Sequence, residues 1–146
     1  MSFRLSRIVA LLCTGIGTGA LAGDIVIVDP YVRMVPLGVP TTGAFMTLKN
    51  TGNADRRLLR VDSPAAKTVE LHNHLNDNGV MKMRQVREIR IKAGSETELR
   101  PGSYHVMMID LKQPLQEGEK VPLALSFDDG RSEKVEAIVR HPVGAR

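Results

Sequence analysis

Short apolar or alternating runs recur along the chain, and residues typical of turns separate them. Turn residues (Asn, Asp, Gly and Pro) cluster at 50–53, 78–79, 101–102 and 128–130. No run keeps the roughly 3.6-residue period of a long amphipathic helix. We therefore expect one all-β domain, a sandwich or Greek-key barrel of about eight or nine short strands. The expected strands cover residues 25–28, 44–48, 57–61, 68–74, 80–91, 97–99, 104–111, 121–127 and 134–139.

The first residues differ in character from the rest of the chain. Arg4 and Arg7 are the only charges before Asp24, and apolar or small residues fill positions 8–21. An Ala-Leu-Ala sequence ending at residue 22 offers small side chains where a signal peptidase reads them. The apolar stretch of about 14 residues is shorter than the roughly 20 that a bilayer-spanning helix needs. This arrangement is typical of a secretory signal peptide.

A lipoprotein signal at Cys13 is not expected, because Leu12 precedes it where a small residue is needed. We predict a signal peptide over residues 1–22, cleavage after Ala22, and one domain over residues 23–146. The exported domain would be periplasmic, with no membrane anchor after cleavage.

Composition narrows the function further. The chain has 146 residues, a formal net charge of +4 and only 3% aromatic residues. No basic run is interleaved with aromatic side chains, so nucleic acid is not an expected partner. The single cysteine lies within the predicted signal peptide. The exported chain would therefore lack disulfides, thiolate ligands and cysteine nucleophiles, and a soft metal would be left with Met and His.

Histidine and methionine recur at a spacing of two in three short segments. In a strand, residues two apart share a face, so each of these pairs points to one side of the sheet. The pairs are His72 and His74, Met81 and Met83, and His105 and Met107.

The turn between the first two pairs decides whether they meet. A four-residue loop over 76–79 would place His74 opposite Met81 and His72 opposite Met83. A two-residue turn at 78–79 would place His74 opposite Met83. Both even loops keep the four side chains on one face, with opposed Cβ atoms roughly 5 Å apart. An odd loop would separate the histidines from the methionines.

Imidazole and thioether donors together suit a soft or borderline ion, and thioether sulfur suits Cu(I) best. Magnesium and calcium prefer oxygen ligands. Structural zinc prefers Cys and His. A blue-copper centre requires a cysteine thiolate, which the exported chain would lack.

The spacing resembles that of the periplasmic copper chaperones known as the PCu(A)C family. Their signature is a His, ten residues, a Met, twenty-one residues and then His-x-Met, which His72, Met83, His105 and Met107 match. Similarity extends to flanking segments at residues 31–33, 43–46, 50–52, 70–72, 79–84, 101–102, 104–107 and 121–123.

The resemblance implies a cupredoxin-like β-barrel, expected to be monomeric, that binds one Cu(I) through His72, Met83, His105 and Met107. It also implies delivery of copper to the CuA centre of cytochrome c oxidase subunit II, directly or with a Sco-type protein. His74 and Met81 lie outside the four-ligand motif. Both are possible auxiliary residues: His74 could support the ligands, bind Cu(II) weakly or face solvent, and Met81 could line the rim or help to pass the copper on. The tail over 141–146 is not rich in His and Met, so no second copper site is expected there.

Three other readings remain open. A copper or zinc enzyme is disfavoured, because no carboxylate lies within the His–Met segments at a spacing that suggests a general base. A non-metal secreted interaction module would use the methionines as a contact surface. A copper resistance or buffering protein would use the same site. Elsewhere, Met34, Met46 and Met108 are expected in the core, as ordinary packing residues.

Overall fold

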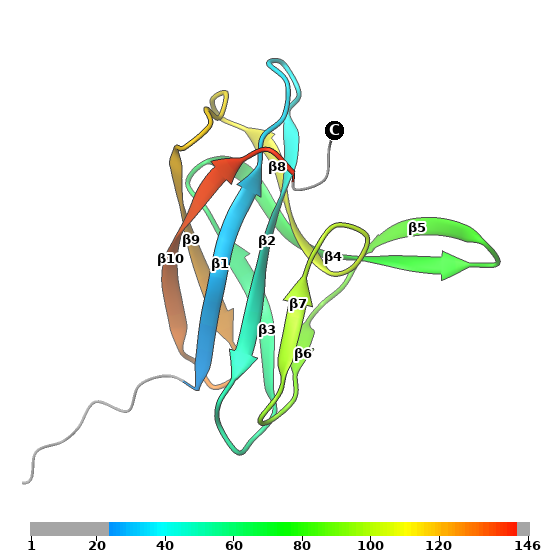
Figure 1. Ribbon diagram of the computed structural model, residues 1–146, viewed down its shortest axis with the longest axis vertical. Coiled ribbons are helices and arrows are strands. Elements are labelled where there is room, and N and C mark those ends of the chain that lie inside the picture. Colours follow the sequence, from blue (N-terminus) through cyan, green and yellow to red (C-terminus); the bar gives the residue numbers. More distant parts are fainter. Residues whose placement is uncertain (1–23, 143–146) are drawn as a thin grey trace, which may run out of the picture.

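The computed structural model describes residues 24–142, and in this range it contains ten β-strands and no helix (Figure 1). The predicted signal peptide therefore lies outside the described residues. No helix long and apolar enough to cross a membrane occurs between residues 24 and 142. The strands are β1 (Ile25–Arg33), β2 (Thr41–Asn50), β3 (Arg56–Asp62), β4 (Ala66–Asp77), β5 (Val80–Gln85), β6 (Ile89–Ile91), β7 (Glu96–Leu99), β8 (His105–Leu111), β9 (Lys120–Phe127) and β10 (Ser132–Arg140).

The strands form one sheet in the order β5-β4-β8-β2-β1-β10-β9-β3-β6, and β7 pairs separately with β2. The β1–β10 pair is parallel, whereas the other pairs are antiparallel. Figure 1 shows the sheet curled into an elongated body, with the β4–β5 hairpin projecting to one side. The predicted all-β class is confirmed. The sheet is not closed, because its path ends at β5 and β6.

Ten strands form where nine were predicted, because the expected strand over 80–91 is divided. After β5 the chain turns at Val86, whose N–H donates a 2.8 Å hydrogen bond to the Leu71 carbonyl. It then leaves β4 and pairs with β3 as β6. A continuous apolar pattern could not reveal this change of partner, since β5 and β6 belong to opposite ends of the sheet.

Alternate residues of the strands fill the core, as period-two patterning requires. On β8, Val106 and Met108 are fully buried, and on β4 Leu71 is 4% exposed. The intervening residues face the other side of the sheet. Met46 and Met108 are core residues as predicted, and Met34 is partly buried against the core.

Strand β1 runs past the predicted end at residue 28 because it contains a bulge. Its register with β2 shifts between Val28 and Tyr31. Asp29 lies in this interval with a φ of 51°, a backbone conformation that Asp tolerates better than most residues. The bulge lets the chain pass Pro30 and continue pairing to Arg33.

The two faces of β8 predict different costs for similar substitutions. Met108→Ala leaves a cavity in the core and should lower the free energy of unfolding by about 2–5 kcal/mol. Met107→Ala, on the other face, should cost about 1 kcal/mol or less. Urea denaturation of both metal-free variants measures the difference. Equal losses would contradict the assignment of the two faces.

Candidate metal centre

Three strands bring histidine and methionine together on the outer face of the sheet. In the β4–β8 pair His72 lies opposite His105, and Glu70 lies opposite Met107. In the β2–β8 pair Met107 lies opposite Gly43. Burial of the alternate residues of β4 and β8 in the core leaves these side chains on the outer face. His105 is nevertheless only 3% exposed, because neighbouring outer-face side chains cover it.

The β4–β5 hairpin has the two-residue turn, and the four-residue alternative is wrong. Asp77 pairs with Val80, and the turn residues Asn78 and Gly79 have φ values of 52° and 85°. Positive φ at both central positions defines the type I′ turn, which favours Asn-Gly. His74 consequently lies opposite Met83, as the shorter turn predicts.

The same register keeps Met81 and His72 away from the His74–Met83 pair. Met81 lies opposite Asn76 near the tip of the hairpin and is 56% exposed. His72 lies opposite Gln85 rather than Met83. The hairpin therefore brings one histidine, His74, directly to one methionine, and leaves His72 closer to the body of the sheet.

A cavity of about 360 Å³ lies at this corner and is lined in part by His74, Met83, His105 and Met107. His72 and Met81 are not among its lining residues. The ring centroid of His105 lies 5.1 Å from that of His74 and 5.7 Å from that of His72. The structure thus gathers three imidazoles, two of them in ring contact with His105, next to two thioethers.

Hydrogen bonds leave a nitrogen free on each histidine. His105 Nδ1 lies 3.0 Å from the Ser103 carbonyl, which can only accept, so Nδ1 is the protonated nitrogen and Nε2 keeps its lone pair. His72 Nε2 lies 2.8 Å from Glu70 Oε2, an arrangement that leaves Nδ1 as the free nitrogen. Such carboxylate and carbonyl partners orient histidines that bind metals.

Two imidazole nitrogens at this corner are buried without any hydrogen-bond partner. They are Nδ1 of His72 and Nδ1 of His74. A buried polar atom without a partner is costly, and an ion at this corner would accept its lone pair. The donor set is therefore chemically suited to a soft metal ion. Among residues 24–142, no group of three or more His, Cys, Asp or Glu side chains is arranged to hold a metal ion. A mixed set with thioether sulfur is thus the candidate.

Burial lowers the pKa of His105, because the charged imidazolium is poorly solvated at this position. The hydrogen bond to Ser103 opposes the shift, whereas the nearby His74, His72 and Arg33 add to it. A lowered pKa keeps the imidazole neutral, which is the form that binds metals.

The rest of the cavity wall was not anticipated from the sequence. Phe45 lies beside His105, with ring centroids 6.2 Å apart, and Arg33 also lines the cavity. Gly43 makes room for the Phe45 ring, since a Cβ at Gly43 would lie 2.9 Å from Phe45 Cζ. Both segments show family similarity in the sequence, but only the folded strands bring them to the histidines.

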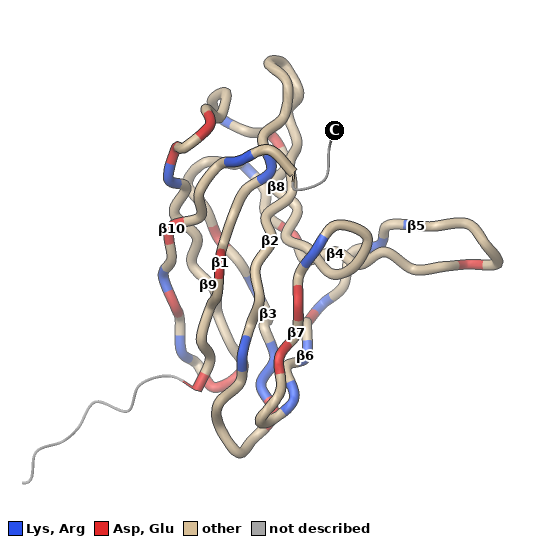
Figure 2. Tube along the Cα trace, viewed as in Figure 1, with Lys and Arg blue, Asp and Glu red and all other residues tan. Residues whose placement is uncertain are grey.

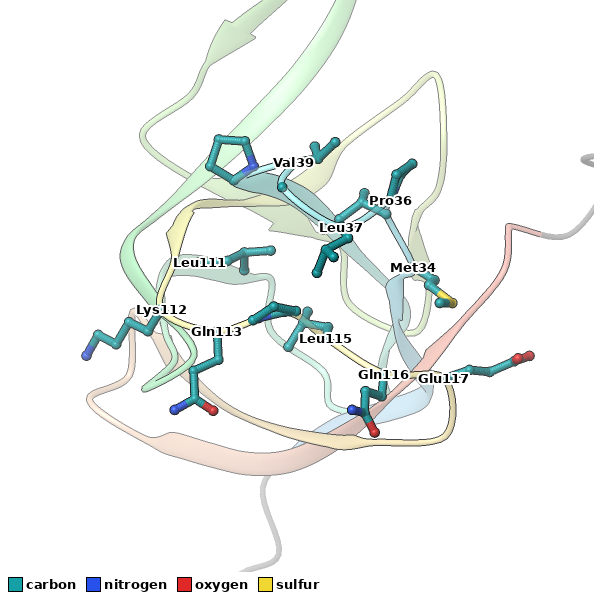
Figure 3. A pocket seen from close by; sticks show the side chains of 14 residues that line it. Met34, Pro36, Leu37, Val39, Leu111, Lys112, Gln113, Leu115, Gln116 and Glu117 are labelled. Atoms are coloured by element: carbon teal, nitrogen blue, oxygen red, sulfur yellow. The ribbon is translucent and has the colours of Figure 1, made fainter.

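A second cavity, of about 460 Å³, lies between residues 34–40 and 111–117 (Figure 3). Its lining is mainly apolar and includes Leu37, Val39, Leu111 and Leu115. No histidine lines it, so it does not share the chemistry of the first cavity.

The open, all-β sheet has the architecture of a cupredoxin-like PCuAC domain. Superposition on "Copper-bound PCuAC domain from PmoF2" gives a TM-score of 0.70 at 22% identity, over 82% of this chain and 95% of that chain. The Cu(I) form of DR1885 from Deinococcus radiodurans gives 0.71 at 31% identity, over 88% of this chain and 87% of that one.

Residues 25–139 match the family described as LpqE-like, "Putative lipoprotein LpqE-like". The chain belongs to this family. "Putative lipoprotein Lxx21020" of Leifsonia xyli is 34% identical, over 87% of this chain and 76% of the relative. "Uncharacterized protein RP573" of Rickettsia prowazekii is 32% identical, over 70% of this chain and 59% of the relative.

The lowered pKa of His105 predicts a pH-dependent stability. As the pH falls through about 6.5, the unfolded chain takes up a proton at this position before the folded chain does. The free energy of unfolding of the metal-free protein should therefore decrease between about pH 7 and 5. The lowered carboxylate pKa values of Asp55 and Asp128 act below this window, since their unperturbed value is 3.8.

Thermal denaturation over this range should show a smaller decrease in His105→Asn than in the unmodified protein. His141→Asn is the matched control, because the His141 side chain is 65% exposed. If the melting temperatures of His105→Asn and of the unmodified protein fall equally with pH, the folded site does not disfavour the imidazolium.

Proposed function

We propose that this protein is a periplasmic Cu(I) chaperone that binds one copper ion through His72, Met83, His105 and Met107. The observation that carries the proposal is the cavity at which His105, Met83 and Met107 meet, beside buried imidazole nitrogens without partners. The 31% identity to DR1885, whose Cu(I)-bound form has been solved, adds support. His74 lines the same cavity and is the auxiliary ligand candidate.

The donor chemistry suits transport of copper rather than catalysis. Thioether sulfur is a soft, neutral donor that protons do not compete for, so it favours Cu(I) over harder ions. A soft Cu(I) ion held by thioethers does little to generate a metal-bound hydroxide, so no hydrolytic role is proposed. Met83 is 45% exposed, which gives an incoming ligand access to one side of the ion. Transfer would then proceed by exchange of one ligand at a time, without turnover chemistry.

The destination of the copper is the finer part of the proposal. Family resemblance favours the CuA centre of cytochrome c oxidase subunit II, reached directly or with a Sco-type protein. Export through the predicted signal peptide over residues 1–22 would place the chaperone in the periplasm. A deletion strain distinguishes delivery from buffering. Loss of oxidase activity that added copper restores supports delivery, whereas copper sensitivity with normal oxidase supports buffering.

Titration with Cu(I) under anaerobic conditions, in competition with a chromogenic Cu(I) chelator, tests the site. We expect one tightly held Cu(I) per chain. Met83→Leu and His105→Ala should each weaken binding by at least about tenfold, because each removes a donor. Met81→Leu is the matched control on the same strand and should bind like the unmodified protein.

Comparison of the Cu(I) affinities of His72→Gln and His74→Gln shows which of these two histidines binds copper together with His105. A larger loss in His72→Gln supports the proposed ligand set, and a larger loss in His74→Gln would replace His72 by its neighbour. No competition with the chelator in the unmodified protein would overturn the copper proposal as a whole.

A further inference from the structure

Beside the cavity, arginine and aromatic side chains stack along the outer face of β1, β2 and β10. The Arg140 guanidinium carbon lies 3.9 Å from the centroid of the Tyr31 ring. The Tyr31 and Phe45 centroids are 5.2 Å apart. The Arg33 guanidinium carbon lies 5.1 Å from the centroid of Phe45. This stack ends at the wall of the cavity that contains His105 and Met107.

The two arginines are neighbours with different surroundings. Arg33 and Arg140 pair across the parallel β1–β10 ladder, and Figure 2 shows basic positions at the adjoining ends of these strands. Arg140 is neutralised by Asp29, which accepts hydrogen bonds of 3.1 and 2.8 Å from its two terminal nitrogens. Arg140 does not line the cavity.

Arg33 carries an uncompensated charge in the cavity wall. Within residues 24–142, no carboxylate forms an ion pair with it. Its Nε is buried without a hydrogen-bond partner. Glu70, an acidic residue on β4, is engaged with His72 and does not line the cavity. The guanidinium is thus held by its contact with Phe45, an attraction between a cation and the face of a ring.

We propose that Arg33 sets the oxidation-state preference of the site by opposing a doubly charged copper ion more than a singly charged one. The inference rests on the proposed copper binding at His105, Met83 and Met107. Coulomb repulsion is proportional to the charge of the ion, so a fixed positive charge disfavours Cu(II) by one additional unit of charge. The thioethers favour Cu(I) through their softness, and Arg33 adds a second, electrostatic selection that is independent of the donors.

The test compares the affinities for Cu(I) and Cu(II) in Arg33→Gln and in the unmodified protein. Cu(I) is measured by anaerobic competition with a chromogenic chelator, and Cu(II) by competition with a chelator of known Cu(II) affinity. Arg33→Gln should raise the Cu(II) affinity relative to the Cu(I) affinity by about tenfold. This is equivalent to lowering the reduction potential of the bound ion by about 59 mV. Cu(II) that still binds to His105→Ala is subtracted as binding elsewhere.

Two control variants separate charge from structure. Arg33→Lys keeps the charge and should keep the original ratio of affinities. The double variant Arg140→Gln/Asp29→Asn removes the neighbouring ion pair, which carries no net charge, and should leave the ratio unchanged. An unchanged ratio in Arg33→Gln, or an equal change in Arg33→Lys, would overturn the inference. If the unmodified protein binds Cu(I), either of these results overturns only the role of Arg33 and leaves the proposed function standing. If the unmodified protein does not bind Cu(I), the proposed function and the role of Arg33 are both overturned.

Discussion

Burial of alternate side chains along β4 and β8 is the constraint on which the candidate site depends. Leu71 and Val106 lie opposite each other in the core, so the flanking His72 and His105 must lie opposite each other on the outer face. A shift of one residue in this pairing would put the histidines into the core and the apolar residues into solvent. The hydrophobic energy of the core therefore also determines the geometry of the site, although none of the donors contributes to the core itself.

Much of the fold and part of the site were predictable from the sequence. The turn residues and short apolar runs define the strands, because the alternation of side chains and the positions of the turns are local properties of the sequence. The shared face of His105 and Met107 follows from the same periodicity. The choice between a four-residue and a two-residue loop did not follow, since both place the donors on one face. Positive φ at Asn78 and Gly79 settled it.

Contacts between distant strands account for what the sequence did not predict. Strand β1 reaches the site only because the bulge at Asp29 lets it continue beyond Pro30. Phe45 then lies between Tyr31 and His105, and Arg33 lies over its ring. No spacing along the chain links these residues to the histidines. The division of residues 80–91 between two ends of the sheet has the same origin, because it depends on which strands are free to pair.

The exposure of Met83 has a consequence for the chemical durability of the site. Its side chain is 45% exposed on the projecting hairpin, so peroxides can reach the sulfur from solvent. Oxidation to the sulfoxide would replace a soft donor by a polar group with a harder oxygen. The core would not be disturbed, since Met83 lies outside it. Oxidative damage at this one atom would thus leave a folded protein with an impaired donor set, and enzymatic reduction of the sulfoxide would restore it.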